Sequence, residues 1–141
     1  MAKLEGGCLC GNVRYSGDTD PAVTAVCHCK NCQKQTGTAF SILVGVPKAA
    51  VEITGDSLAL YEDRGDSGNP VKRFFCKSCG SPIYSETVDG GGMIFIKAGT
   101  LDEFPPGSIT LIKSGRFFLS RLDDGSFLAM WQRCTHLGCS V

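Results

Sequence analysis

The spacing of seven cysteines constrains this chain more than any other feature. They occur as a closely spaced pair near the start, then a group of three, and much later a second pair: Cys8 and Cys10, then Cys27, Cys29 and Cys32, then Cys76 and Cys79. Structural zinc is held by four protein ligands, whereas catalytic zinc keeps three and leaves a position for water or substrate. Seven ligands therefore predict one closed metal site and one open site.

The spacing also predicts which cysteines belong together. On a strand, side chains two positions apart face the same way, so both thiols of the first pair would point to one side, as would those of Cys27 and Cys29. The last pair has the two-residue gap of a metal-binding turn, followed by Gly80 where the backbone must double back. If the two pairs meet, they form one four-thiolate site that couples metal binding to folding. Cys27, Cys29 and Cys32 then remain as an open triad.

Composition indicates the compartment and excludes several partners. The amino terminus lacks the apolar core of a signal peptide, and no apolar run approaches the ~20 residues of a membrane span. We therefore expect a cytoplasmic protein with no membrane partner, in which closely spaced cysteines bind metal rather than form disulfides. Iron is the main alternative to zinc, because four thiolates suit both metals. Basic and acidic residues balance at 14 each, which predicts no nucleic-acid partner.

Short runs rich in Val, Ile, Phe and Thr alternate with turn-forming residues, and the chain contains 18 glycines. This pattern predicts a mainly β fold of short antiparallel sheets with few or no helices. Only Asn31–Gln35 is expected to form a helical turn. The expected strands are Asn12–Tyr15, Ala22–Cys27, Phe40–Val46, Val51–Thr54, Ala59–Glu62, Val71–Phe75, Ile83–Ser85, Met93–Ala98, Ile109–Lys113, Arg116–Leu122 and Phe127–Trp131.

One internal boundary is expected, at the turn-forming segment Phe104–Gly107. We therefore predict a zinc domain over residues 1–106 and a C-terminal hairpin extension over residues 107–141, packed on the same domain. Within the extension, Asp123–Gly125 separates two apolar runs and is a hairpin signal, because glycine supplies the positive φ of a tight turn.

Four segments carry a family resemblance: Gly6–Tyr15, Cys27–Phe40, Phe75–Gly80 and Lys97–Asp102. In this order they resemble the glutathione-dependent formaldehyde-activating enzyme (GFA) family, which includes the centromere protein V group, over residues 1–104. The resemblance implies an Mss4-like zinc-binding β-sheet fold. By the same resemblance, a structural zinc is bound by Cys8, Cys10, Cys76 and Cys79, and a catalytic zinc by Cys27, Cys29 and Cys32.

Three thiolates would leave a bound zinc with a net charge of about minus one, which suits it to hold a fourth thiol in deprotonated form. The resemblance implies a carbon–sulfur lyase, similar to an S-hydroxymethylglutathione synthase. Such an enzyme condenses a small-molecule thiol such as glutathione with an aldehyde such as formaldehyde. The alternative is a non-catalytic zinc-binding module that acts as a thiol or glutathione carrier or as an interaction domain. A protein fourth ligand at the second zinc would favour this alternative. The oligomeric state is left open.

Residues close to the open triad in the sequence are candidates for binding the thiol substrate. Lys30 and Lys34 could meet a glutathione carboxylate, although surface lysines are more often only solvated. Thr36 occupies the family's Thr-Gly position and is expected to shape the turn beside the zinc. His28 is expected to be structural or solvent-facing rather than a general base. Lys97 ends an apolar strand and is expected to extend to water.

The segment Phe117–Cys139 resembles the first half of a Rieske iron–sulfur domain. By that resemblance Cys134 and His136 would be cluster ligands and Cys139 a disulfide cysteine. A Rieske cluster needs two cysteines and two histidines, so half a ligand set predicts no complete Fe–S cluster. We interpret the segment as a remnant that pads the domain. The alternatives are a third metal site completed by another chain, and a contribution of Cys134 or His136 to the open zinc.

Overall fold

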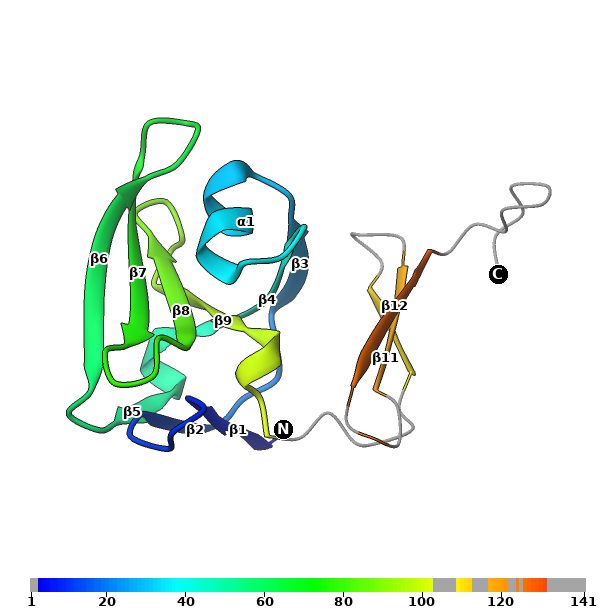
Figure 1. The fold of residues 1–141 in the computed structure, drawn as a ribbon, viewed down its shortest axis with the longest axis horizontal. Helices are drawn as coiled ribbons and strands as arrows, with labels where there is room; N and C mark the ends of the chain where they lie inside the picture. The colour runs from blue at the N-terminus through cyan, green and yellow to red at the C-terminus, as the bar shows by residue number, and fades with distance from the viewer. Residues whose placement is uncertain (1–2, 103–108, 113–116, 122–123, 125, 132–141) are drawn as a thin grey trace. The chain divides into compact units, whose positions relative to one another are not determined.

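The computed structural model describes residues 3–102, 109–112, 117–121, 124 and 126–131. The chain divides into two compact units, Met1–Asp102 and Glu103–Val141. Antiparallel strands dominate both units, which confirms the predicted mainly β fold (Figure 1). The predicted boundary at Phe104–Gly107 lies outside the described part of the chain. None of the described helices has the length and apolar character needed to cross a membrane.

The first unit begins with a three-stranded sheet. It consists of β1 (Lys3–Gly7), β2 (Arg14–Asp18) and β5 (Glu52–Thr54), with β2 in the centre. The sequence does not predict β1, because Leu4 is its only large apolar residue. The strand predicted at Asn12–Tyr15 begins two residues too early, since the preceding residues form a turn.

A six-stranded antiparallel sheet follows, in the order β3-β4-β9-β8-β7-β6. Its strands are β3 (Val23–Cys27), β4 (Ser41–Pro47), β6 (Leu58–Arg64), β7 (Pro70–Cys76), β8 (Pro82–Thr87) and β9 (Met93–Lys97). The sequence predicts all six, with ends that differ by one or two residues, as strand ends commonly do. Two short 3-10 helices, η1 (Lys48–Ala50) and η2 (Ala98–Thr100), follow β4 and β9.

The helix α1 (Lys30–Thr36) lies between β3 and β4 in the chain and contacts β4 (Figure 1). Its N-terminus is capped by Cys29, whose Sγ accepts a hydrogen bond from the N–H of Cys32 at 3.4 Å. It ends at Gly37, whose φ of 67° strains any residue that carries a Cβ. The helical turn predicted at Asn31–Gln35 is confirmed, and the helix extends one residue beyond it at each end.

The two faces of the six-stranded sheet differ in chemistry. Val44, Ile96 and Tyr84 are paired across β4, β9 and β8, so their side chains share one face. They are buried in one apolar core with Leu4 and Tyr15 of the three-stranded sheet. Because side chains alternate along a strand, the residues between them belong to the opposite face. The open triad and its neighbours lie on that opposite face.

The second unit contains a three-stranded antiparallel sheet of β10 (Ile109–Ile112), β11 (Phe117–Arg121) and β12 (Phe127–Trp131). The pairing of β11 with β12 confirms the predicted hairpin. In its turn, the carboxylate of Asp124 accepts a hydrogen bond from the N–H of Ser126 at 2.9 Å. The predicted tail ligands Cys134 and His136, and the third tail residue Cys139, lie outside the described residues.

Candidate functional site

Four cysteines from two distant parts of the first unit meet in one cluster: Cys8, Cys10, Cys76 and Cys79. Cys8 and Cys10 follow β1 in a turn that continues to Gly11, whose φ is 79°. The prediction that this pair lies on a strand is therefore wrong, and a turn presents the two thiols instead. Cys76 ends β7, and Cys79 precedes Gly80, whose φ of 78° confirms the predicted reversal.

The four sulfur atoms have the spacing that a tetrahedral metal requires. All lie within 4.8 Å of one another, and Sγ of Cys10 is 3.5 Å from Sγ of Cys8 and 3.7 Å from Sγ of Cys76. Zinc–sulfur bonds of about 2.3 Å place the sulfurs of a tetrahedron about 3.8 Å apart. The cluster thus fits a four-thiolate metal site.

Hydrogen bonds favour the thiolate, the form that binds metal, at Cys8 and Cys79, whereas the neighbouring sulfurs contribute to a pKa of about 12 at Cys10. The hydroxyl of Ser81 lies 3.2 Å from Sγ of Cys79, and hydrogen bonding by Ser81 lowers the pKa of Cys79 to about 5. Burial opposes ionisation of Cys8, but the N–H of Val13 donates to its Sγ at 3.2 Å, and the net effect is a lowered pKa. Ser81 also accepts a hydrogen bond from the N–H of Leu9 at 3.1 Å, which ties the two cysteine turns together.

The second cluster brings together the predicted triad, which we call the open triad: Cys27, Cys29 and Cys32. Cys27 ends β3, Cys29 caps α1, and Cys32 lies inside α1 and is buried. The prediction that Cys27 and Cys29 share a strand is wrong, because the strand stops at Cys27. The helix cap brings the three sulfurs within 4.8 Å of one another all the same. His28 is exposed and its ring packs against Phe40, as expected of a structural or solvent-facing imidazole.

In the open triad, the ionisation of one thiol affects the pKa of its neighbours. Burial, together with the neighbouring sulfurs of Cys27 and Cys29, raises the pKa of Cys32 to about 11, although the positive charges of Lys97 and Arg73 act in the opposite direction. Burial also opposes ionisation of Cys29, but hydrogen bonds from the backbone of Cys32 and from the neighbouring thiols lower its pKa. Three thiolates in this position therefore need positive charge nearby.

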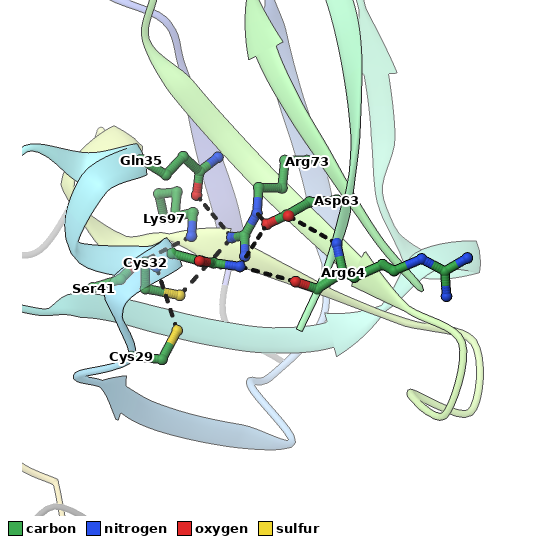
Figure 2. Close-up of polar contacts among 9 residues, drawn as sticks. Cys29, Cys32, Gln35, Ser41, Asp63, Arg64, Arg73 and Lys97 are labelled. Carbon is green, nitrogen blue, oxygen red and sulfur yellow. Dashed lines mark hydrogen bonds and ion pairs between the residues drawn. The ribbon is translucent and has the colours of Figure 1, made fainter. Parts of the chain in front are cut away.

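Arg73 supplies one positive charge. It is buried on β7, and its Nη1 lies 3.9 Å from Sγ of Cys32 and donates to Oε1 of Gln35 at 3.3 Å. Its Nε donates to Asp63 at 2.7 Å, and Asp63 also accepts from Asn31 of α1 at 3.1 Å. Figure 2 shows this chain of contacts running from β6 through Arg73 to the triad. The guanidinium is therefore fixed against the triad from two sides.

Lys97 supplies a second positive charge. It ends β9 and is only 4% exposed, so the prediction that it extends to water is wrong. Its Nζ donates to Oγ of Ser41 at 3.2 Å (Figure 2). Burial lowers the pKa of Lys97, and negative charge on Cys32 acts in the opposite direction. Cys27 pairs with Ser41 across β3 and β4. Lys97 pairs with Leu43 two positions further along β4, so these side chains share one face.

A pocket of about 420 Å³ is lined by neighbours of the open triad, although none of the three cysteines is among its lining residues. Its wall includes Lys97, Ser41 and Thr36, and the hydroxyl of Thr36 donates to the carbonyl of Cys32 at 2.8 Å. Lys30 and Lys34 are exposed on α1 and are not among the residues that line it. The structure thus brings Thr36 to the pocket and leaves the two lysines on the helix surface.

Sequence reasoning misses Arg73, Asp63 and Ser41 as neighbours of the triad. A signal for Arg73 is present, because it occupies an alternating position between apolar residues of a predicted strand, where a buried charge needs a partner. No local signal identifies Asp63 or Ser41, since their roles depend on how distant strands pair.

Comparison with sequence models of known protein families assigns this chain to a family. The sequence model described as "GFA: Glutathione-dependent formaldehyde-activating enzyme" matches residues 3–115. The chain belongs to the GFA family. A Podospora anserina protein that provisionally carries the same enzyme name is 35% identical over 81 residues, which cover 55% of this chain and 36% of that protein. An Emericella nidulans protein with the same provisional name is 31% identical over 84 residues, which cover 58% of this chain and 41% of that protein.

A Schizosaccharomyces pombe protein named as an uncharacterized lyase is 26% identical over 98 residues, which cover 70% of this GFA chain and 68% of that protein. Among solved structures, a Rhodobacter sphaeroides protein superposes with a TM-score of 0.58 at 20% identity. The superposition covers 72% of this chain and 91% of that one, so the two share a fold. The chain spans less than half the length of the Podospora and Emericella relatives.

Proposed function

We propose that this chain is a cytoplasmic zinc-dependent enzyme of the carbon–sulfur lyase type. It condenses a thiol such as glutathione with an aldehyde such as formaldehyde. The observation that carries the proposal is the open triad, in which three sulfurs meet and whose neighbours Thr36, Ser41 and Lys97 line a pocket. Within the described part of the chain, no fourth Cys, His, Asp or Glu joins them. Membership of the GFA family and the names of its relatives support the same chemistry.

The donor set of the triad fits zinc, and zinc held there would keep a substrate thiol in its thiolate form. Positively charged residues of this chain would stabilise the excess negative charge of such a site. Three thiolates exceed the charge of a divalent ion by about one, and a substrate thiolate adds another. Arg73 and Lys97 offset that surplus, while Asp63 fixes the guanidinium in place. We assign Cys27, Cys29 and Cys32 as the ligands of this zinc.

Substrate binding is assigned to the pocket and to the surface of α1. The pocket has room for a peptide-sized thiol, and Thr36 connects its wall to the backbone of Cys32. Lys30 and Lys34 remain the proposed contacts for a glutathione carboxylate, because both are exposed cations on the helix that carries Cys32. We assign a structural zinc to the four-thiolate cluster, whose geometry and the lowered pKa values of Cys8 and Cys79 fit it.

The proposal is tested by exchange NMR. Formaldehyde labelled with ¹³C and glutathione form their adduct spontaneously, so exchange between free and adduct carbon is measured with and without the zinc-loaded full chain. We expect the exchange rate to rise in proportion to protein concentration. Native mass spectrometry of the same sample should report two zinc ions per chain, and a further mass for bound glutathione.

The matched control is Cys29→Ser, which removes one ligand of the open triad and leaves the four-thiolate cluster intact. This variant should keep one zinc and lose the acceleration. Glutathione binding without any acceleration by the unmodified protein would contradict the enzyme and support the non-catalytic thiol carrier.

A further inference from the structure

Lys97 has fewer partners than a buried ammonium normally requires. An ammonium carries three donors, and within the described residues Nζ of Lys97 has one hydrogen-bond partner, Oγ of Ser41. No described carboxylate forms an ion pair with it. Both Lys97 and Ser41 are nearly completely buried. Burying donors without partners costs free energy, so unpaired donors on a buried lysine indicate a functional role.

Lys97 is one of the residues against which the proposed substrate pocket lies. Lys97 lines this pocket together with Ser41 and Thr36. Strand register puts Lys97 on the same face as Cys27, and Figure 2 shows its ammonium beside Cys32. A reactant that occupies the pocket next to the triad therefore comes within reach of a fixed positive charge.

We propose that Lys97 is a catalytic residue that donates a hydrogen bond to the carbonyl oxygen of the aldehyde. This inference rests on the proposed function. When the substrate thiolate attacks the carbonyl carbon, a carbon–sulfur bond forms and the π electrons of the C=O bond move to oxygen. Lys97 stabilises the negative charge that develops there, and the oxygen then takes a proton from water. The thiol has already released its own proton to solvent, so the overall reaction is RSH plus aldehyde to hemithioacetal.

The role of Ser41 follows from the same geometry. Its hydroxyl accepts the hydrogen bond of Nζ and so fixes the direction of the ammonium. A preorganised donor stabilises developing charge better than a mobile one, because it needs no rearrangement during the reaction. Ser41 is thus a positioning residue that acts through Lys97.

The test compares Lys97→Met with the unmodified full chain, both loaded with zinc. We expect kcat for adduct formation to fall roughly 10²–10³-fold, the loss typical of removing one oxyanion donor. Zinc stoichiometry by native mass spectrometry and the Kd for glutathione by calorimetry should not change. Ser41→Ala should lower kcat by a smaller factor, and it supplies a second test if Lys97→Met fails to fold. Lys72→Met, which removes an exposed lysine of β7, is the matched control and should leave kcat unchanged.

A binding readout accompanies the kinetics. Formate is a one-carbon anion, and its negatively charged oxygen resembles the aldehyde oxygen on which negative charge develops during the reaction. In ¹³C-formate titrations followed by NMR, we expect binding to the unmodified protein and at least roughly 10-fold weaker binding to Lys97→Met, the size of effect expected on losing a charged hydrogen bond.

The following results would overturn the inference. An unchanged kcat or unchanged formate affinity in Lys97→Met would exclude an oxyanion donor. Loss of the second zinc in this variant would show that Lys97 serves only as a counter-ion of the thiolates. Weaker glutathione binding with unchanged kcat would make it a carboxylate anchor. Absence of acceleration by the zinc-loaded, glutathione-bound unmodified protein would instead overturn the proposed function, and this inference with it.

Discussion

Arg73 shows how one side chain joins distant parts of the chain at the level of single residues. Its guanidinium contacts Asp63 of β6 on one side and Cys32 and Gln35 of α1 on the other. Such contacts to a metal ligand orient the ligand and tune its charge. We therefore expect Arg73 to be as important for the open triad as a direct neighbour of the metal.

The first prediction follows from this contact. Arg73→Met should weaken zinc binding at the open triad by about 10–100-fold, as loss of a hydrogen bond to a metal ligand typically does. Competition with a chromophoric chelator measures the affinity. Arg64→Met is the matched control, because Arg64 is exposed beside Asp63 and does not contact the triad. Equal zinc affinities for the two variants would contradict the role assigned to Arg73.

The second prediction concerns Ser85, which lies opposite Arg73 on β8. Its hydroxyl is buried and has no hydrogen-bond partner among the described residues. Removing an unsatisfied buried hydroxyl recovers its desolvation cost, so Ser85→Ala should raise the free energy of unfolding by about 1 kcal/mol. Urea denaturation measures the change. Ser16→Ala, at an exposed position of β2, should change it much less. A loss of stability in Ser85→Ala would disprove the account.

Elements of the first unit are tied together where β1 meets the segment after β9. The hydroxyls of Tyr15 and Thr100 lie 2.9 Å apart, and Thr100 also donates to the carbonyl of Lys97 at 2.8 Å. Gly6 lies in the same place and forms a bridge to Leu101. The close approach requires glycine, since a Cβ on Gly6 would come within 2.2 Å of the Tyr15 hydroxyl oxygen.

The third prediction is that Gly6→Ala destabilises the fold by roughly 1–3 kcal/mol, the usual cost of overpacking a closely packed site. Thermal unfolding followed by circular dichroism measures this loss. Gly65→Ala serves as the control, because the nearest atom to a Cβ there is 3.6 Å away. If the two variants unfold at the same temperature, β1 does not depend on this contact.

The sequence predicts the strands of the six-stranded sheet but not β1, and the difference has physical causes. Strands of the six-stranded sheet are rich in β-branched and aromatic residues, so their positions are evident from composition alone. β1 is held by pairing with β2 and by the contact at Gly6, neither of which leaves a local signal. The two cysteine clusters are predictable because candidate metal ligands recur at short spacing. The buried partners of the triad are not, since Asp63 and Ser41 reach it only through strand pairing.

At the scale of the whole molecule, the two cysteine clusters should contribute differently to stability. The four-thiolate cluster joins the start of the first unit to the turn after β7, so it closes most of that unit. Structural zinc supplies folding free energy on the order of 10 kcal/mol at neutral pH. The open triad joins only β3 to the adjacent helix.

The fourth prediction follows. Cys76→Ser should unfold or strongly destabilise the domain, whereas Cys29→Ser should lose one zinc and still unfold cooperatively. Calorimetry together with metal analysis measures both properties. Equal damage in both variants would show that the division into structural and open sites is wrong.

The fifth prediction concerns the C-terminal extension. Half of a Rieske ligand set cannot hold a two-iron cluster, so the purified protein should be colourless and contain zinc without acid-labile sulfide. Removing residues 108–141 should leave zinc in the four-thiolate cluster, because all four ligands belong to Met1–Asp102. Stoichiometric iron and sulfide in fresh protein would make the extension a metal site. The division at residues 106 and 107 stays a prediction.

The turn that follows β7 has a wider consequence. Cys79 belongs to the four-thiolate cluster, while Ser81 and Pro82, directly beyond it, form part of the pocket wall. If zinc organises this turn, as proposed, a newly made chain that has not yet acquired this zinc would lack a finished wall. Scarcity of zinc would then lower the proposed activity through the scaffold, even in chains whose open triad is intact. The proposed activity would thus depend on metal supply at the four-thiolate cluster as well as at the open triad.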